Sequence, residues 1–455
     1  MRHLARLCSP KSPHPTLHSG GKLGFSSPPG GRMGGGVAEY GQASAAPPMD
    51  PAVPKHRREP RARLLPPRHG LQETATLPIP DELVAEIFLL LPTPTDLVRA
   101  SAACVSFYRL VASRSFLRRF RKLHAPPLLG FLDDRVFHPA IPPYPSASAA
   151  NAVALAADFS FSFLPGPARD WEVLDVLDGR VLLKRPGRQH PEMVVCDPLY
   201  RRYLLLPLFP DDLSASLEGP SAIKWRESFL VPPGDEEAAT AEETSFTVIW
   251  MAQCKFRLFT FVFSSRTGQW GAVPSPSWSD LFAGLPSLEM AAPLDRRQYA
   301  YGCFYWMASY MAEAKMLVLD TRRMEFSIAE SLPDCFAMAM VEAGEGRPGV
   351  FVHAHGGSKF SYSIRQNYGG SLNQWQEEKT ISLGYGYYIM GSTERYLFLY
   401  QLQSSLPDPG VFTLDVQTFQ LERVCGQQLG HAYSNFPPSL LSSPTVSSGV
   451  EKGAE

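Results

Sequence analysis

The stretch that decides the fold is residues 258–270, LFTFVFSSRTGQW, where an apolar run leads through a polar turn to an aromatic residue. Residues 258–263 are apolar, aromatic or β-branched, a composition that favours a strand. Ser264 can accept hydrogen bonds from backbone amides inside the turn, and Trp270 restarts the apolar pattern. The stretch therefore predicts a β-hairpin.

The same hairpin pattern recurs along the chain, with Asp in the place of Ser, at residues 196–203, 319–326 and 414–421. A weaker copy lies near residues 366–375. The copies are about 50–70 residues apart, and a period of roughly 50 residues is typical of kelch-like four-stranded blades. Residues 155–436 therefore predict a kelch-like β-propeller of five or six blades. A propeller closes on itself, whereas an open pair of β-sheets leaves long edges exposed.

Upstream of this all-β region, residues 77–124 have the period of short helices. Pro80, Asp81 and Glu82 suit the first turn of a helix, because Pro fits there and acids complement the helix dipole. The apolar residues that follow recur at helical spacing and predict one apolar face: Leu83, Val84, Ile87, Phe88 and Leu91. Pro92 ends this helix. Two more short helices and a basic fourth one over residues 115–123 follow. The chain is therefore expected to be an α+β multidomain protein.

The flanking segments have a different composition. Residues 1–76 are rich in Pro, Gly, Ser and Arg, and residues 437–455 in Ser and Pro, so both are expected to be disordered. The first tail has no acid before Glu39, which fits either a transit peptide or an upstream extension without function. Residues 125–154 are punctuated by Pro and predict a linker.

The composition excludes several classes of protein. The formal net charge is -1, so no global field attracts the protein to nucleic acid or to a membrane surface. The seven cysteines lie far apart, with neither zinc-site nor disulfide-scaffold spacing. The chain has no phosphate-binding glycine loop and no stretch of roughly 18–20 apolar residues. We therefore expect a cytoplasmic or nuclear protein without a cofactor, a metal site or catalytic residues.

The helical module resembles the F-box family. That family has a Leu-Pro start, a helix, a second Leu-Pro about a dozen residues later, a Val-Ser pair, and a helix ending in Phe. Pro80, Pro92, Val105 and Phe116 occupy the corresponding places. The usual Lys and Trp after the Val-Ser pair are replaced by Phe and Tyr at residues 107–108. Residues 99–106 and 125–131 are similar to plant, particularly grass, F-box proteins with an associated β domain.

This resemblance implies a substrate-recruiting adaptor of a Skp-cullin-F-box type E3 ubiquitin ligase. The module would dock on a Skp-type linker protein, which holds cullin, and the β domain would bind a protein substrate that the sequence does not identify. The interaction is apolar burial of the helix-in-groove kind. The residues that the resemblance assigns to linker binding are Ile79, Pro80, Leu83, Val84, Ile87, Phe88, Leu91, Pro92, Leu97, Val105, Ser106, Tyr108 and Phe116.

Two alternatives stay open at this point. The chain can be a kelch-like propeller that binds a small ligand or a sugar, with the helices as an N-terminal cap. Acids, His and Arg converging in a funnel would favour that reading. It can also be a linker-binding protein that works outside a ligase, and capture of the linker without cullin would favour that one.

Overall fold

A computed structural model describes most of the chain between Ile79 and Asn435. The described residues are 79–124, 126–133, 136–186, 191–210, 225–232, 245–254, 256–274, 276–282, 294–310, 313–330, 335–354, 358–365, 375–401, 409–426 and 430–435. The two tails expected to be disordered lie outside this set, as does most of the weak hairpin copy near residues 366–375. None of the helices in the described part is long and apolar enough to span a membrane.

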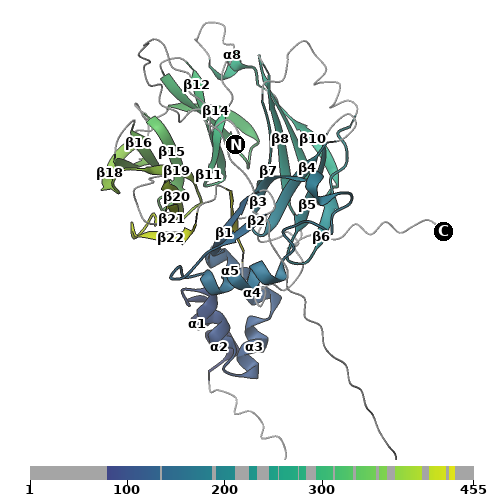
Figure 1. Cartoon of the computed structure of the whole chain (residues 1–455), viewed down its shortest axis with the longest axis vertical. Coiled ribbons are helices and arrows are strands. Elements are labelled where there is room, and N and C mark those ends of the chain that lie inside the picture. Colours follow the sequence, from purple (N-terminus) through teal and green to yellow (C-terminus); the bar gives the residue numbers. More distant parts are fainter. Residues whose placement is uncertain are drawn as a thin grey trace, which may run out of the picture. The chain divides into compact units, whose positions relative to one another are not determined.

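The helical module contains α1 (Asp81–Leu89), α2 (Pro94–Ser101), α3 (Val105–Val111) and α4 (Arg114–Leu123) (Figure 1). The side chain of Thr93 accepts a hydrogen bond from the amide of Asp96 (3.1 Å) and caps α2. Ser113 caps α4 in the same way through the amide of Phe116 (3.3 Å). These caps satisfy backbone donors that the first turn of a helix leaves unpaired, so each short helix has a defined start.

In the rest of the described part, the strands form six antiparallel sheets, five of them with four strands. The first two sheets are β3 (Glu172–Leu177), β4 (Arg180–Arg185), β5 (Glu192–Asp197), β6 (Arg202–Leu205), and β7 (Trp225–Val231), β8 (Thr247–Gln253), β9 (Leu258–Ser264), β10 (Gln269–Val273). The third is β11 (Asp295–Ala300), β12 (Cys303–Tyr310), β13 (Glu313–Asp320), β14 (Glu325–Glu330). The last two are β15 (Cys335–Glu342), β16 (Pro348–Ala354), β17 (Lys359–Arg365), β18 (Trp375–Ser382), and β19 (Tyr387–Ser392), β20 (Tyr396–Gln401), β21 (Gly410–Asp415), β22 (Leu421–Cys425).

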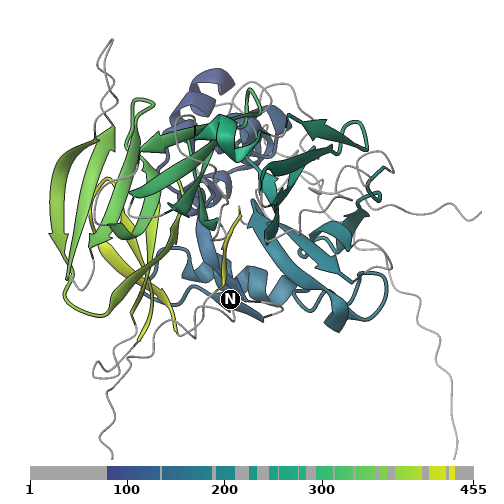
Figure 2. The same cartoon turned by 90° about the horizontal axis from the view of Figure 1, so that it is seen from above.

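The sheets are the blades of a six-bladed β-propeller, and Figure 2 shows them arranged around a common axis. The first strands of neighbouring blades lie together at the centre: β3 contacts β7, and β15 contacts both β11 and β19. The sixth sheet has the order β2-β1-β23, from β1 (Leu128–Asp133), β2 (Val136–Pro139) and β23 (His431–Ser434). Its inner strand comes from the end of the β region and its outer strands from the beginning, so this pairing closes the ring. The predicted propeller is confirmed, with six blades.

Residues 125–154, which the composition predicts to be a linker, contain β1, β2 and most of α5 (Ala147–Ala156). The prediction of a linker differs from the structure because the apolar run of β1 is short and lies between two Pro-rich segments. Its partner strand β23 lies some 300 residues away in sequence, and local pattern cannot reveal such a pairing. The helix α5 packs on β1 and β2.

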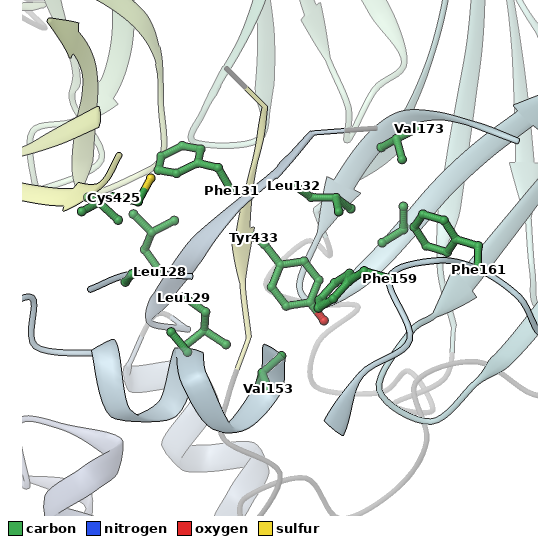
Figure 3. Close-up of a cluster of buried hydrophobic side chains, with 14 of the residues drawn as sticks. Leu128, Leu129, Phe131, Leu132, Val153, Phe159, Phe161, Val173, Cys425 and Tyr433 are labelled. Atoms are coloured by element: carbon green, nitrogen blue, oxygen red, sulfur yellow. The ribbon is translucent and has the colours of Figure 1, made fainter. Parts of the chain in front are cut away.

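The core of the closing blade is shown in Figure 3. Phe131 and Leu132 of β1 are buried there, and Tyr433 of β23 lies against Phe159 with ring centroids 5.1 Å apart. The hydroxyl of Tyr433 donates to the carbonyl of Gly179 in the next blade (3.4 Å). The closing strand is therefore held by buried aromatic packing as well as by its ladder.

The predicted turns recur between the third and fourth strands of the blades. In the turn after β13, Oδ1 of Asp320 accepts hydrogen bonds from the amides of Arg322 (2.9 Å) and Arg323 (3.2 Å). In the turn after β21, Oδ1 of Asp415 accepts from Gln417 (2.8 Å) and Thr418 (3.0 Å). The hairpin prediction is confirmed at these turns, and each carboxylate accepts backbone amide hydrogen bonds within the turn, as the sequence pattern indicates.

A buried ionic cluster joins three consecutive blades. Arg297 of β11 donates to Asp175 of β3 and to Glu227 of β7, at 2.6 Å in both cases. Asp175 also accepts from the amide of Leu230 (2.8 Å), and Glu227 from the indole of Trp306 (3.0 Å). Every carboxylate in this cluster therefore has at least two donors, the condition for burying charge without a large loss of stability.

Candidate functional site

Four of the residues that the resemblance assigns to linker binding lie in the interior of the helical module. Val84 and Phe88 of α1, Leu97 of α2 and Phe116 of α4 are all buried in one apolar cluster. The short helices bury their apolar sides against one another because none is stable alone. In this structure these four side chains support the surface of the module instead of forming it.

The opposite side of α1 carries apolar side chains in solvent. Ile79, Leu83, Ile87 and Leu90, which we call the α1 stripe, have exposed fractions from 42 % for Ile79 to 81 % for Leu90. Leu83 and Ile87 are four residues apart and lie on one face of α1, while Ile79 directly precedes the N-cap Pro80 and Leu90 is the C-cap residue. The apolar face predicted for α1 is therefore only partly covered: Val84 and Phe88 are buried, whereas Leu83 and Ile87 are exposed.

Helix α3 adds two exposed apolar residues. Val105 is 58 % exposed and Tyr108 is 62 % exposed, and Ser106 between them is exposed too. Phe107 is half-buried and packs edge-on against Phe88, with ring centroids 5.0 Å apart. The two residues that depart from the family pattern therefore differ in burial: Phe107 packs against the core, and Tyr108 lies at the surface.

Three predicted residues remain. Pro80 precedes α1 and accepts the first hydrogen bonds of that helix through its carbonyl oxygen, from the amides of Leu83 (3.0 Å) and Val84 (3.1 Å). Pro80 and Pro92 are exposed, and Leu91 is half-buried against the core. The two prolines therefore delimit α1, and Leu91 lies at the margin of its buried face.

Two contacts from α4 hold α1 in place. Arg119 forms an ion pair with Glu86 in the middle of α1 (2.6 Å). The ring of His124 bonds through Nε2 to the carbonyl oxygen of Leu89, the last residue of α1 (2.7 Å), and stacks on Phe120. The α1 stripe therefore lies on a helix that is anchored at its centre and at its C-terminus.

Leu90 is the most exposed apolar residue of the module, yet the F-box resemblance does not assign it to linker binding. The residue lies seven positions after Leu83 and three after Ile87, the spacing of one helix face. That spacing was the available signal, and the adjacent Leu89 and Leu91 obscure it because the run of three leucines has no period.

The chemistry offered by this surface is apolar burial. Hydrogen bonding with Ser106 lowers the pKa of the Cys104 thiol beside α3, and backbone bonds from Phe107 and Ser106 act in the same direction. Among the residues that the structure describes, no group of three or more His, Cys, Asp or Glu side chains could hold a metal ion. A rigid helix with an exposed apolar face is suited to binding another protein.

Comparison with known families identifies the module. Residues 77–122 match a family model described as F-box-like. The match spans about a tenth of the chain and includes α1, α2, α3 and nearly all of α4. The chain therefore carries an F-box-like domain ahead of its propeller. A search of curated proteins finds no match.

Several solved structures are similar to the chain at low scores. An oligogalacturonate lyase in complex with manganese has a TM-score of 0.32 and 7 % sequence identity, over 55 % of this chain and 62 % of that one. The β-propeller domain of the Trilobed protease from Pyrococcus furiosus has a TM-score of 0.31 and 9 % identity, over 57 % and 71 %. TolB from Acinetobacter baumannii has a TM-score of 0.26 and 12 % identity, over 59 % of this chain and 71 % of that one. These scores carry no argument, so the strand topology alone identifies the propeller.

Proposed function

We propose that this protein, with an F-box-like domain at residues 77–122, is a substrate-recruiting adaptor of a Skp-cullin-F-box type E3 ubiquitin ligase. The helical module docks on a Skp-type linker protein and reaches cullin through it, and the propeller binds the protein to be ubiquitinated. The adaptor performs no chemistry of its own. The cytoplasm or the nucleus, where such ligases work, is the proposed location. The plant-type lineage and the kelch-like character of the blades are part of the same proposal.

The α1 stripe is the observation that carries the proposal. Four large aliphatic side chains lie in solvent on α1 or directly beside its ends, while Val84, Phe88 and Leu89 of the same helix are buried. Exposed apolar area of this kind is unfavourable in water by roughly 25 cal/mol per Å², and a protein partner that covers it recovers that free energy. An F-box-like domain supplies the identity of the partner, because such domains generally bind Skp-type linkers.

The arrangement raises the rate of ubiquitin transfer by proximity. One polypeptide holds the target and, through the linker and cullin, the ubiquitin-charged enzyme. Tethering converts the encounter of target and enzyme into an intramolecular event with a higher effective concentration. The adaptor needs only two binding surfaces for this purpose.

Co-purification with the linker protein tests the proposal. We expect Leu83→Ala combined with Ile87→Ala to abolish capture, because both side chains are exposed and the fold does not depend on them. The control is Leu155→Ala on α5, which removes an even more exposed leucine outside the module. Full capture by the double variant would contradict the proposal.

A second comparison distinguishes a ligase adaptor from a protein that only binds the linker. Wild-type protein that captures both the linker and cullin supports the adaptor. Capture of the linker without cullin, under conditions where another F-box protein captures both, would contradict it.

A further inference from the structure

The turn between β8 and β9 presents an aromatic side chain to solvent. Phe256 is 54 % exposed, although most aromatic residues of the propeller are buried between its blades. Exposed aromatic residues are enriched at the centres of protein interfaces, where they supply much of the binding energy.

The turn is held by its backbone. The amide of Cys254 donates to the carbonyl of Arg257 (2.9 Å) and closes the turn. The amide of Trp278 donates to the carbonyl of Phe256 (2.9 Å), and its indole donates to the carbonyl of Cys254 (3.0 Å). Trp278 is completely buried, so it anchors the turn from below. Phe256 is thus exposed on a rigid support, which lowers the entropy cost of binding to it.

Two cations accompany Phe256. Arg226 of β7 and Arg257 are exposed, and neither forms an ion pair within the described part of the chain. Ala252 of β8 pairs with Arg226 on one side and with Phe259 on the other, and the guanidinium group of Arg257 lies 5.9 Å from the centroid of the Phe259 ring. Both cations therefore lie on the same part of this blade. The charge beside the exposed ring is therefore positive.

A carboxylate also belongs to this neighbourhood. Hydrogen bonds from Ser277 lower the pKa of Asp280, with a further contribution from Arg257. Asp280 is already occupied by the hydroxyl (2.6 Å) and the amide (3.3 Å) of Ser277, with which it forms a capping box. The site thus has two cations and one acid that is already hydrogen-bonded. This arrangement suits a short acidic peptide segment better than a nucleic-acid strand, which needs a continuous row of cations.

The strand directions give this turn its place in the propeller. The inner strand β23 ends, and its partner β1 begins, at the same end of the closing blade, because Leu128 pairs with Ser434. The module is joined to the propeller at that end, since α4 lies just before β1 in sequence. β7 is the inner strand of its blade, as β23 is of the closing blade, and the inner strands of a propeller run in the same direction. The turn after β8 lies where β7 begins, because Trp225 pairs with Gln253, and this is the other end of the propeller. Phe256 is therefore at the end of the propeller opposite the attachment of the module.

We propose that Phe256, Arg226 and Arg257 form a docking site for a segment of the recruited protein that has an apolar side chain flanked by acidic residues. This inference rests on the proposed adaptor function and specifies the partner of its β domain. The apolar side chain packs on the ring of Phe256, and the flanking carboxylates pair with the two guanidinium groups.

A positional-scanning library of eight-residue peptides tests the site, with the full chain bound to the linker protein. Each pool has one fixed residue and seven random ones. We expect pools with Leu, Ile, Phe or Met at one position, and Asp or Glu beside it, to bind most strongly. Phe256→Ala should weaken binding of the selected peptide about tenfold or more, and Arg226→Glu with Arg257→Glu should abolish it.

The control variant is Tyr385→Ala, which removes an exposed aromatic residue that does not belong to the site and should leave peptide binding unchanged. Selection of basic or charge-independent peptides, equal binding by Phe256→Ala, or stronger binding of single-stranded oligo-dT than of the acidic pools would overturn the inference. Linker capture by each variant is recorded in parallel. If the wild type does not capture the linker, the proposed adaptor function is wrong. If the wild type captures the linker but the expected peptide preference is absent, only this inference is wrong.

Discussion

The α1 stripe and the strand β20 place similar side chains in opposite surroundings. Leu83, Ile87 and Leu90 of the stripe lie in solvent, whereas Leu397 and Leu399 of β20 are completely buried. The propeller covers its apolar residues with the neighbouring blades, and the ring leaves no blade without a neighbour. The small module has too few layers to cover both faces of α1. The difference shows that the apolar residues of the blades are covered by the fold itself, whereas those of the α1 stripe are left in solvent.

The largest expected effect is on the propeller side of this comparison. Arg297→Ala leaves Asp175 and Glu227 buried without their cation, and breaking a buried ion pair in this way costs about 3–5 kcal/mol. Urea denaturation should show the loss as a lower midpoint. The matched change is Arg296→Ala, which removes a hydrogen bond to the carbonyl of Ile389 and should cost only about 1 kcal/mol. Equal losses in the two variants would contradict the ionic account of how these three blades are joined.

The next effect belongs to the core of the module. Leu97→Ala removes a completely buried side chain and should destabilise the module by about 2–5 kcal/mol. Because the buried cluster of the module includes no residue of the blades, amide hydrogen exchange should accelerate in α1–α4 and stay unchanged in the propeller. Leu155→Ala on α5 is the exposed control and should change neither region. Equal acceleration in both regions would show that module and propeller unfold together.

The smallest effect concerns the turns that follow the third strand of a blade. Burial opposes ionisation of Asp415, but hydrogen bonds from Thr418, Gln417 and Arg395 lower its pKa below the ordinary value. A lowered pKa in the folded state stabilises the fold above the unfolded pKa of about 3.9, and this contribution is lost as pH falls through the folded value. Asp415→Asn should therefore cost about 1 kcal/mol at pH 7 and progressively less below about pH 4.

Asp320→Asn is the matched change for that prediction, because Asp320 makes the same two turn bonds and no ion pair with a described residue. Its cost at pH 7 should be smaller, because the ion pair with Arg395 exists only at Asp415. Denaturation of the two variants at several pH values measures the difference. A larger loss for Asp320→Asn, or a loss for Asp415→Asn that grows in acid, would contradict this account of the turns.

Much of the fold is predictable from local pattern, and the hairpin turns show why. An Asp at the end of a strand accepts amide bonds within three residues of itself, so the turn after Asp320 or Asp415 is encoded where it forms. The helices of the module are similarly local, because Pro80 and Thr93 begin them and the apolar spacing continues them. Such features need no knowledge of distant residues.

The closing blade is not predictable in this way. The pairing of β1 with β23 joins the two ends of the β region, and neither strand shows a signal for the other. The cluster around Arg297 is equally distant in sequence, with Asp175 122 residues away. Both features follow from ring closure, which is a property of the whole chain.

The candidate site was predicted in part. The residues that begin and end α1 and the stripe positions Leu83 and Ile87 follow from the motif. The division between covered and exposed faces does not, because Leu83 and Val84 are adjacent and equally apolar, yet one is exposed and the other buried. That division depends on where α3 and α4 pack, which the sequence of α1 alone does not contain.

Calorimetric titration of the purified chain with the linker protein tests the central claim most directly. If the α1 stripe is covered by the linker, Leu83→Ala with Ile87→Ala should lose about 2–4 kcal/mol of binding, a roughly 30- to 1,000-fold rise in Kd. The unfolding midpoint of the double variant should stay within about 0.5 kcal/mol of the wild type, because both side chains are exposed. An unchanged Kd with the fold intact would contradict the assignment of this face to the linker.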